Sequence, residues 1–469
     1  MSLPATSLPL HRGGRVRPDD RASSVEVRQI VLLFVAALLL NHLVGTWLLQ
    51  DAPVIGDALQ YLERARQLFR GEDDGLPHYW PPGAPLVLAG LFTLLGRADM
   101  AIAQVFMSVL SALTTVLVFL LAHECRGRRS VAWGAALLHG LSPTTLWMAR
   151  QTETHTFCAL WIAAASLFAV RFLRRGAWTD LLLAAVYAAA LVLTRPGSAP
   201  LLLLLAALPL VRTRRWPLVL PQTAAVLLVA LVFLLPVLQF NHARGAGWVL
   251  STNNERNFFI GNNPHTPAYK TGHLAWRPLE ALPADTQAYL RRHYEAADPR
   301  QAMMQSSLAY LREAPWAFVQ RCASRFRNYW AFDYEQGRRL QIHLAALGPV
   351  SWVPAVLQAL GSAALVWLFV LGLPALVRQG QGRWVGGVLL VCLLYQLPHV
   401  VAFSSPVYRA GLGPLICVLA AAGWQALRAE RTSGLARPSH RSRLTVAVLS
   451  TVLLLAIHVE AAWHLVALR

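Results

Sequence analysis

Two carboxylates and two arginines stand at the ends of long apolar runs, where a membrane protein meets water. Asp57 and Tyr61 follow the first apolar run, and Glu153 separates the third run from the fourth. Arg195 and Arg409 lie at turns between later runs. A carboxylate can take a proton from a hydroxyl, and a guanidinium fork matches the oxygens of a phosphate. This set suits acid–base chemistry and phosphate binding at the lipid–water boundary.

Each of these residues also has a purely structural interpretation. Asp57 suits a helix N-cap, which composition alone favours over a general base. Glu153 suits either a solvated acid at the start of the next helix or a second carboxylate that orients an acceptor or holds a metal. Arg195 and Arg409 break the positive-inside rule, which favours anion binding over contact with lipid head groups.

Further polar residues lie at the same predicted face of the membrane, namely His78, His155, Asn262, Asn263, Lys270 and Tyr408. We expect His155 to be a packing residue of the interface. The middles of the apolar runs are almost free of ionisable groups, with His139 as the main exception. A transporter or proton pump would place its charges near the midplane instead.

The composition indicates a helical membrane protein. The 469 residues are 56% hydrophobic and 14% charged, and the apolar runs are much longer than the strands of a membrane barrel. The net charge of +19 comes mostly from short arginine clusters beside apolar runs, and Lys270 is the sole lysine. That distribution is typical of membrane topology and argues against nucleic-acid binding.

The cysteines predict neither a zinc site nor a disulfide framework. Five of them are scattered without a Cys-x-x-Cys pair. We expect no required cofactor, although Glu153 and His78 leave room for a divalent ion. The first residues lack the apolar core of a cleaved signal, so we interpret 1–29 as a basic cytoplasmic tail before an uncleaved anchor.

Long apolar runs predict about eleven membrane spans. Their approximate ranges are 30–49, 99–121, 131–148, 154–171, 181–194, 197–212, 217–239, 353–377, 385–403, 408–426 and 444–465. Arginine clusters precede the first span and follow spans 2, 4, 6, 8 and 10, which predicts a cytoplasmic N-terminus. The turns that carry the candidate residues then face outward.

This pattern divides the chain into four parts. The basic tail 1–29 precedes a transmembrane module, 30–240, whose first outer loop covers 50–98. A small periplasmic loop or domain spans 241–348, and further transmembrane helices fill 349–469. Within the outer loop, 84–95 is too short to span, because about 12 residues of helix cover only ~18 Å.

An amphipathic helix interrupted at Pro315 is predicted over 301–330. Its arginines, among them Arg321 and Arg325, are expected to face head groups or a lipid phosphate, opposite apolar residues such as Phe318 and Trp330. A helix that merely supports a lid is an equal alternative.

Several motifs in order resemble one family of membrane enzymes. They are GDALQYLERA (56–65), YWPPGAPL (79–86), Thr152-Glu153, Thr194-Arg195-Pro196, FIGNNP (259–264), AYLREAP (309–315) and Tyr408-Arg409. This set, spread over nearly the whole chain, is similar to bacterial GT-C glycosyltransferases, the group of the protein O-mannosyltransferases and the lipid A aminoarabinose transferase. The predicted spans are fewer than those of the fullest members, and we expect no further outer domain in the C-terminal region.

The resemblance implies a GT-C helical bundle that transfers a sugar from a polyprenyl phosphate to an acceptor hydroxyl, with inversion. It implies Asp57 as the base and Arg409, together with Arg195 or Lys270, as phosphate ligands. Glu153 joins the catalytic pair, and Tyr61, His78, Asn262, Asn263 and Tyr408 join the substrate site. The expected location is the outer face of a bacterial cytoplasmic membrane, and the acceptor is a lipid, a glycan or a protein.

Two other classes of function compete with this interpretation. A transporter or flippase of lipid-linked sugars would need a polar path across the midplane, which the sequence does not provide. A non-catalytic scaffold that presents 241–348 to a partner would leave the outward arginines unexplained.

Overall fold

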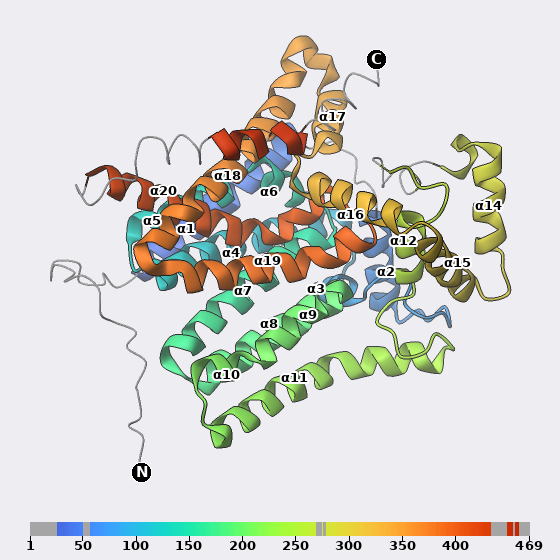
Figure 1. Ribbon diagram of the computed structural model, residues 1–469, viewed down its shortest axis with the longest axis horizontal. Helices are drawn as coiled ribbons and strands as arrows, with labels where there is room; N and C mark the ends of the chain where they lie inside the picture. Colours follow the sequence, from blue (N-terminus) through green and yellow to red (C-terminus); the bar gives the residue numbers. More distant parts are fainter. Residues whose placement is uncertain are drawn as a thin grey trace.

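The chain folds into a bundle of helices. The computed structural model describes residues 26–49, 57–268, 274, 278–432, 448–453 and 455–458. Within these ranges the backbone forms helices and turns and no β-strand, so the predicted all-α class is confirmed. In Figure 1, α11 (Trp216–Ala243) runs along one edge, α14 (Ala284–Tyr294) and α15 (Pro299–Glu313) form one end, and α17 (Tyr334–His343) projects from another edge.

Long apolar helices make this a multi-pass membrane protein. Among the described residues, six segments are long and apolar enough to cross a membrane, namely Val27–Trp47, Met100–Arg126, Thr154–Arg175, Trp216–Ala243, Ala345–Val401 and Pro406–Glu430. They contain the helices α1 (Val27–Leu43), α4 (Met100–Arg126), α7 (Thr154–Arg175), α11, α18 (Trp352–Leu376), α19 (Gly382–Val401) and α20 (Gly413–Thr432). The fifth segment holds both α18 and α19, which are separated by a turn at Gly380 with φ of 77°.

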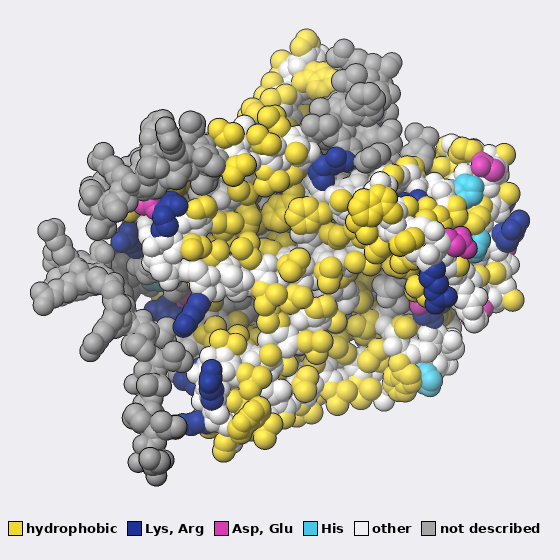
Figure 2. Space-filling model, viewed as in Figure 1, with side chains coloured by type: hydrophobic (Ala, Val, Ile, Leu, Met, Phe, Trp, Pro, Cys, Tyr) yellow, Lys and Arg dark blue, Asp and Glu magenta, His cyan; other side chains and the backbone are white. Residues whose placement is uncertain are grey.

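The outer helices have the surface that lipid requires. In the most apolar windows of α1 and α11, only 22% of the residues are buried inside the protein. Figure 2 shows hydrophobic side chains spread over most of one face, with arginines grouped near its edges. Such a wide apolar surface is stable in hydrocarbon and not in water.

Helix breaks leave the predicted count of eleven spans open. The predicted third span, 131–148, consists of α5 (Arg129–Gly140) and α6 (Pro143–Met148), because Pro143 starts a new helix. Other apolar helices are short, namely α3 (Gly83–Leu95), α8 (Trp178–Thr194), α9 (Ala199–Ala206) and α10 (Leu208–Arg212). The predicted last span, 444–465, lies only partly within the described residues.

The first outer loop folds back onto the bundle through the corner before α3. The helix α2 (Ala58–Arg70) buries Tyr61 and Leu62, and α3 packs against it. A Cβ at Gly83 would lie 2.7 Å from both the amide nitrogen and the Oγ1 of Thr194. Glycine is therefore required at this corner, because any side chain would push α3 away from the end of α8. This contact places the Arg195 turn beside the outer loop.

The segment predicted as the outer loop or domain, 241–348, is mostly helical. It contains α12 (Asn254–Gly261), η3 (Leu279–Ala281), α14, α15, α16 (Pro315–Trp330), α17 and η4 (Ala345–Ser351). The predicted interruption at Pro315 is present as the boundary between α15 and α16.

The predicted orientation of α16 is wrong. Arg321 and Arg325 are 3% and 0% exposed, and their guanidinium groups donate to the carbonyl oxygens of Thr266, Gly261 and Val401. The exposed side instead carries Trp316, Val319 and Phe326. The arginines turn inward because the irregular backbone beside α16 offers carbonyl groups that need donors. The helix is amphipathic, and its apolar face is the outer one.

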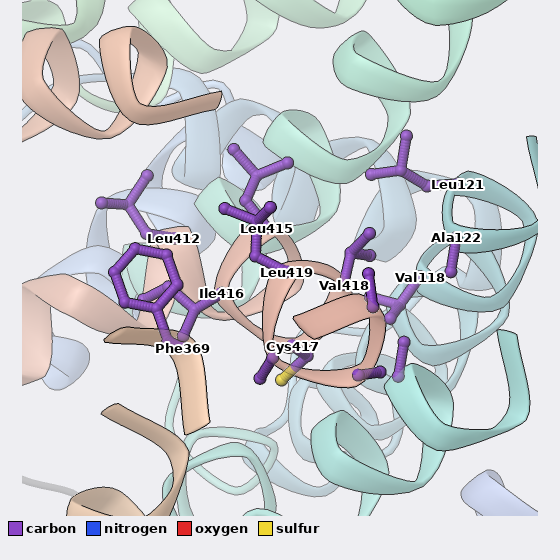
Figure 3. Packing of buried hydrophobic residues seen from close by; sticks show 14 of the residues in the cluster. Val118, Leu121, Ala122, Phe369, Leu412, Leu415, Ile416, Cys417, Val418 and Leu419 are labelled. Atoms are coloured by element: carbon purple, nitrogen blue, oxygen red, sulfur yellow. The ribbon is translucent and has the colours of Figure 1, made fainter. Parts of the chain in front are cut away.

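The largest core lies where α20 packs between α4 and α18. Figure 3 shows Leu415, Ile416 and Leu419 of α20 among side chains of α4 and α18. A Cβ on Gly372 of α18 would lie 2.5 Å from the Cα of Gly423 on α20, so the two backbones touch at that point. Small residues at such a crossing allow close packing between membrane helices.

One carboxylate joins the ends of α4 and α7. Glu124, whose side chain is 12% exposed, accepts from Arg171 Nε at 3.0 Å, Arg174 Nη1 at 3.0 Å and Arg175 Nη2 at 2.7 Å. Hydrogen bonds to charged groups are the stronger ones, and this group has three donors from the neighbouring helix. Glu124 therefore fixes α4 against α7 at this end.

Replacing Glu124 tests that contact. We expect Glu124→Gln to lower the free energy of unfolding by about 1–3 kcal/mol, because three guanidinium groups lose their shared carboxylate. The measurement is the thermal unfolding midpoint of the purified protein in detergent. Glu313→Gln, at an exposed site on α15, is the matched control and should change little. Equal midpoints for the two variants would contradict the role of Glu124.

Candidate active site

Asp57 lies immediately before α2 but does not cap it. Its side chain makes no hydrogen bond to the first turn of the helix. Asp99, by contrast, caps α4 by accepting from the amide of Ile102 at 2.8 Å. The N-cap interpretation of Asp57 is therefore wrong, because a cap must satisfy backbone N–H groups. The Asp57 carboxylate is left for another partner.

The Glu153 turn is tied to the start of α2. Thr152 Oγ1 donates to the carbonyl oxygen of Ala58 at 2.8 Å, so the residues next to Asp57 and Glu153 are hydrogen-bonded. Glu153 precedes α7 and, like Asp57, makes no capping hydrogen bond. Its Oε2 lies 3.2 Å from Nε2 of the buried His155. His155 thus orients a carboxylate in addition to packing.

Arg195 is held from three sides. Its Nη2 donates to Thr154 Oγ1 at 3.0 Å, and its Nη1 lies 3.2 Å from His399 Nε2. Its Cζ stands 4.7 Å from the centroid of the Tyr408 ring, which also stacks on His399. A guanidinium has only donors, so His399 accepts at Nε2 and is a neutral imidazole here. The cation is rigidly positioned above an aromatic face.

The environment of Asp57 favours its protonated form. Burial and the nearby charge of Glu153 raise the pKa of Asp57 from 3.8 to about 6, while Arg195 and Arg256 act in the opposite direction. Burial and the charge of Asp57 also raise the pKa of Tyr61. A carboxyl group with a pKa near neutrality suits proton transfer at the pH of a cell.

The structure brings five of the sequence-predicted residues into one cluster. Asp57, Tyr61, Glu153, Arg195 and Tyr408 interact through charge or ring contacts. We call this group the Asp57 cluster. It forms where the starts of α2 and α7 meet the last turns of α8 and α19 and the helical turn η6 (Pro406–Leu412).

Other predicted residues have structural partners elsewhere. His78 stacks on Phe240 with ring centroids 4.3 Å apart, and burial lowers its pKa to about 4, helped by Arg64 and Arg244. Arg409 Nη1 donates to the carbonyl oxygens of Tyr329 and Ala331 at 3.0 and 2.9 Å. Neither side chain makes a described contact with the Asp57 cluster. Arg409 also lines a groove described below.

The two asparagines support the backbone. Asn262 Nδ2 donates to the carbonyl oxygens of Phe258 and Val401, both at 3.0 Å, and Asn263 Nδ2 donates to that of Phe259 at 2.7 Å. Both residues are fully buried. Lys270, the remaining predicted ligand, lies outside the described residues.

Two members of the site were missed in the sequence. His399 lies in the last turn of the apolar helix α19, and Arg256 lies in α12, where its Nη1 donates to Tyr79 Oη at 2.6 Å. A histidine beside proline near the end of an apolar run was the available signal for His399, since ionisable residues in spans are costly. Arg256 carries no comparable signal. Within the described part of the chain, no group of three His, Cys, Asp or Glu residues could hold a metal ion.

These features define the class as a multi-pass membrane protein with a polar acid–base and cation site at one set of helix ends. Residues 80–240, which include Glu153 and Arg195, match the family described as dolichyl-phosphate-mannose-protein mannosyltransferase. The match confirms the resemblance to the GT-C glycosyltransferase group that the motifs indicated. A comparison with curated proteins gives no match.

The likeness to solved structures is low. The Saccharomyces cerevisiae protein O-mannosyltransferase Pmt1–Pmt2 complex bound to the sugar donor is 17% identical, with 47% of this chain and 34% of that chain covered and a TM-score of 0.37. The oligosaccharyltransferase AglB from Archaeoglobus fulgidus, in complex with an inhibitory peptide and a dolichol-phosphate, is 14% identical, with 92% and 55% covered and a TM-score of 0.48. The chain thus spans between one third and just over one half of the lengths of these proteins.

Because the pKa of Asp57 is raised, replacing this residue should increase the stability of the protein, whereas the loss of a helix cap would decrease it. We expect Asp57→Asn to stabilise the protein at pH 7.5 by up to about 3 kcal/mol, because a buried charge is removed. The folded protein holds the Asp57 proton more tightly than the unfolded chain does. The gain is therefore full above pH 6 and disappears below about pH 4.

Thermal unfolding midpoints of the purified variant between pH 4 and 8 would measure this effect. Asp99→Ala serves as the control, because it removes a side chain that caps α4. It should lower the free energy of unfolding at pH 7.5 by about 1 kcal/mol and lower the midpoint accordingly. A midpoint for Asp57→Asn that falls in the same way would show that Asp57 is a structural residue.

Proposed function

We propose that this chain is a GT-C membrane glycosyltransferase. It moves a sugar from a polyprenyl-phosphate donor to a hydroxyl of a lipid, glycan or protein acceptor, with inversion at the anomeric carbon. The observation that carries the proposal is the uncapped, largely buried Asp57 carboxylate, placed under the influence of both Glu153 and Arg195. The family match over residues 80–240 supports the same class.

Asp57 is assigned the role of general base. The acceptor oxygen attacks the anomeric carbon, its proton passes to Asp57, and the bond from that carbon to the phosphate oxygen breaks. The products are the glycosylated acceptor and the polyprenyl phosphate, and the proton on Asp57 is released to water. General base assistance of this kind is worth about 10²–10⁴ in rate. Glu153, oriented by His155, is suited to hold the acceptor hydroxyl.

Arg195 is assigned to the donor phosphate, with Arg256 as its partner. Both guanidinium groups lower the pKa of Asp57 by their charge and so lie close to the base. Negative charge develops on the leaving phosphate, and fixed cations stabilise such charge without rearrangement. Arg409 is a weaker choice than the sequence indicated, because it already donates to two backbone carbonyls.

The proposed site lies at the outer face of a bacterial cytoplasmic membrane. The arginine pattern supports a cytoplasmic N-terminus, which puts the turns at Glu153, Arg195 and Tyr408 on the opposite side. Polyprenyl-linked sugars are apolar at one end and polar at the other, so a site at the helix ends suits their cleavage. The mechanism as proposed requires no metal.

Asp57→Asn tests the base assignment. The donor for the assay is first identified by mass spectrometry, as the polyprenyl-phosphate sugar that accumulates in a strain lacking the gene. We expect the variant to lose about 10²–10⁴ in transfer rate, because the amide cannot accept the proton. In the unmodified enzyme, kcat/KM should rise with pH through about 6 as Asp57 ionises. Asp74→Asn, at an exposed acid of the same outer loop, should retain activity, and similar rates for both variants would remove the assignment.

Arg195→Ala and Arg409→Ala together test the phosphate assignment. We expect Arg195→Ala to raise the KM for the donor by at least about tenfold, because a charge-assisted contact is lost. Arg409→Ala should leave that KM near its original value and lower the thermal midpoint, since two carbonyl groups lose their donor. Arg70→Ala, at an exposed arginine of α2, is the control. The reverse pattern would return the phosphate to Arg409.

A further inference from the structure

A long groove runs beside the core and reaches η6, where Pro406, Arg409 and Ala410 line it. Its volume is about 1010 Å³, and α5, α6, α18 and α20 line it. Small residues open it, among them Gly134 on α5, Gly361 on α18 and Ala420 on α20. Larger side chains at these positions would fill the space between the helices. Two of its lining residues, Ile416 and Cys417, are also buried members of the core drawn in Figure 3.

The groove has the dimensions of a lipid chain. Its lining on α20 extends from Gly413 to Ala429, which is about 24 Å of helix at 1.5 Å per residue. The hydrocarbon layer of a membrane is ~30 Å thick. The groove therefore follows most of that thickness, and its walls are mainly apolar side chains.

The register of α5 and α20 places two arginines at one mouth of this groove. A Cβ on Gly134 would lie 3.5 Å from the Cβ of Ala421, so these residues face each other. The helices run antiparallel, because the chain continues from α5 into α6, which contacts η6 at the start of α20. Arg128, just before α5, and Arg428, on α20, each lie about two helical turns from that crossing. Because the helices are antiparallel, the two arginines lie at the same end of the groove, and both line it.

The opposite mouth is close to neutral. There the groove is lined by Asp333 and Arg409, and Arg409 donates to the carbonyls of Tyr329 and Ala331. Asp333 is the sole acid among the described residues that line the groove. At the arginine mouth, Arg128 is exposed and Arg428 stacks its Cζ 5.8 Å from the Trp424 ring. The asymmetry favours a negative head group at the arginine mouth.

We propose that this groove binds one anionic phospholipid, with its phosphate between Arg128 and Arg428 and an acyl chain along α20. The predicted orientation puts these arginines on the cytoplasmic side, where phospholipid head groups are available. The lipid would contact η6 at Pro406, Arg409 and Ala410. This site is separate from the proposed sugar-transfer site and does not depend on it.

Native mass spectrometry of the purified full chain tests this proposal. The probes are phosphatidylglycerol and phosphatidylcholine with the same acyl chains, added to delipidated protein in detergent. Because both arginines attract an anionic head group, we expect one phosphatidylglycerol to bind about 10- to 30-fold more tightly than phosphatidylcholine. The preference should decrease at high ionic strength.

Two sets of variants separate head-group and chain binding. The double variant Arg128→Gln with Arg428→Gln should abolish the preference, whereas Arg214→Gln with Arg215→Gln, which removes equal charge outside the groove, should retain it. Ala364→Phe places a ring into the groove from an exposed position on α18 and should weaken both lipids while leaving the thermal midpoint unchanged. Equal affinity for the two lipids would overturn the proposal. Displacement of phosphatidylglycerol by polyprenyl phosphate, one for one, would also overturn it.

Discussion

The candidate site depends on the contacts of one buried cation, the guanidinium of Arg195. It joins Thr154 at the start of α7, His399 near the end of α19 and the ring of Tyr408 in η6. These segments are far apart in the sequence. A buried guanidinium needs acceptors for its N–H groups and is stabilised by an aromatic face. Thr154 and His399 supply the acceptors, and the ring of Tyr408 supplies the face. The same cation influences the proton affinity of Asp57.

Neither carboxylate of the site caps the helix that follows it. Asp57 and Glu153 each stand at a position where an acid commonly caps a helix, yet neither accepts from the first turn. Asp99 shows that this chain does use a cap where stability alone is concerned. Burial and the nearby charge of Glu153 then raise the pKa of Asp57, which holds its proton more tightly. Stability is thereby exchanged for proton affinity near neutral pH.

In a membrane protein, the positions of many helix ends can be predicted from the sequence, as they were for this chain. Apolar run lengths predicted most long helices, and turns between them predicted that Asp57, Glu153, Arg195 and Tyr408 would share one face. The predictions failed where backbone polar groups compete for side chains. Arg321 and Arg325 turn inward to donate to carbonyls, and Asn262 and Asn263 do the same. Composition does not reveal which irregular backbone will lie beside a given arginine.

By itself, the sequence determined the helical class, the approximate extents of the apolar helices and the residue types gathered at their ends. Hydrophobic run length and the need to satisfy backbone groups in lipid are local properties, so they are visible in one dimension. Only the tertiary structure decided that Tyr408 contacts Arg195 while Arg409, the next residue, donates to the carbonyl oxygens of Tyr329 and Ala331. It also added His399 to the site. Those outcomes depend on the directions of side chains and on contacts between distant helices, which run length does not specify.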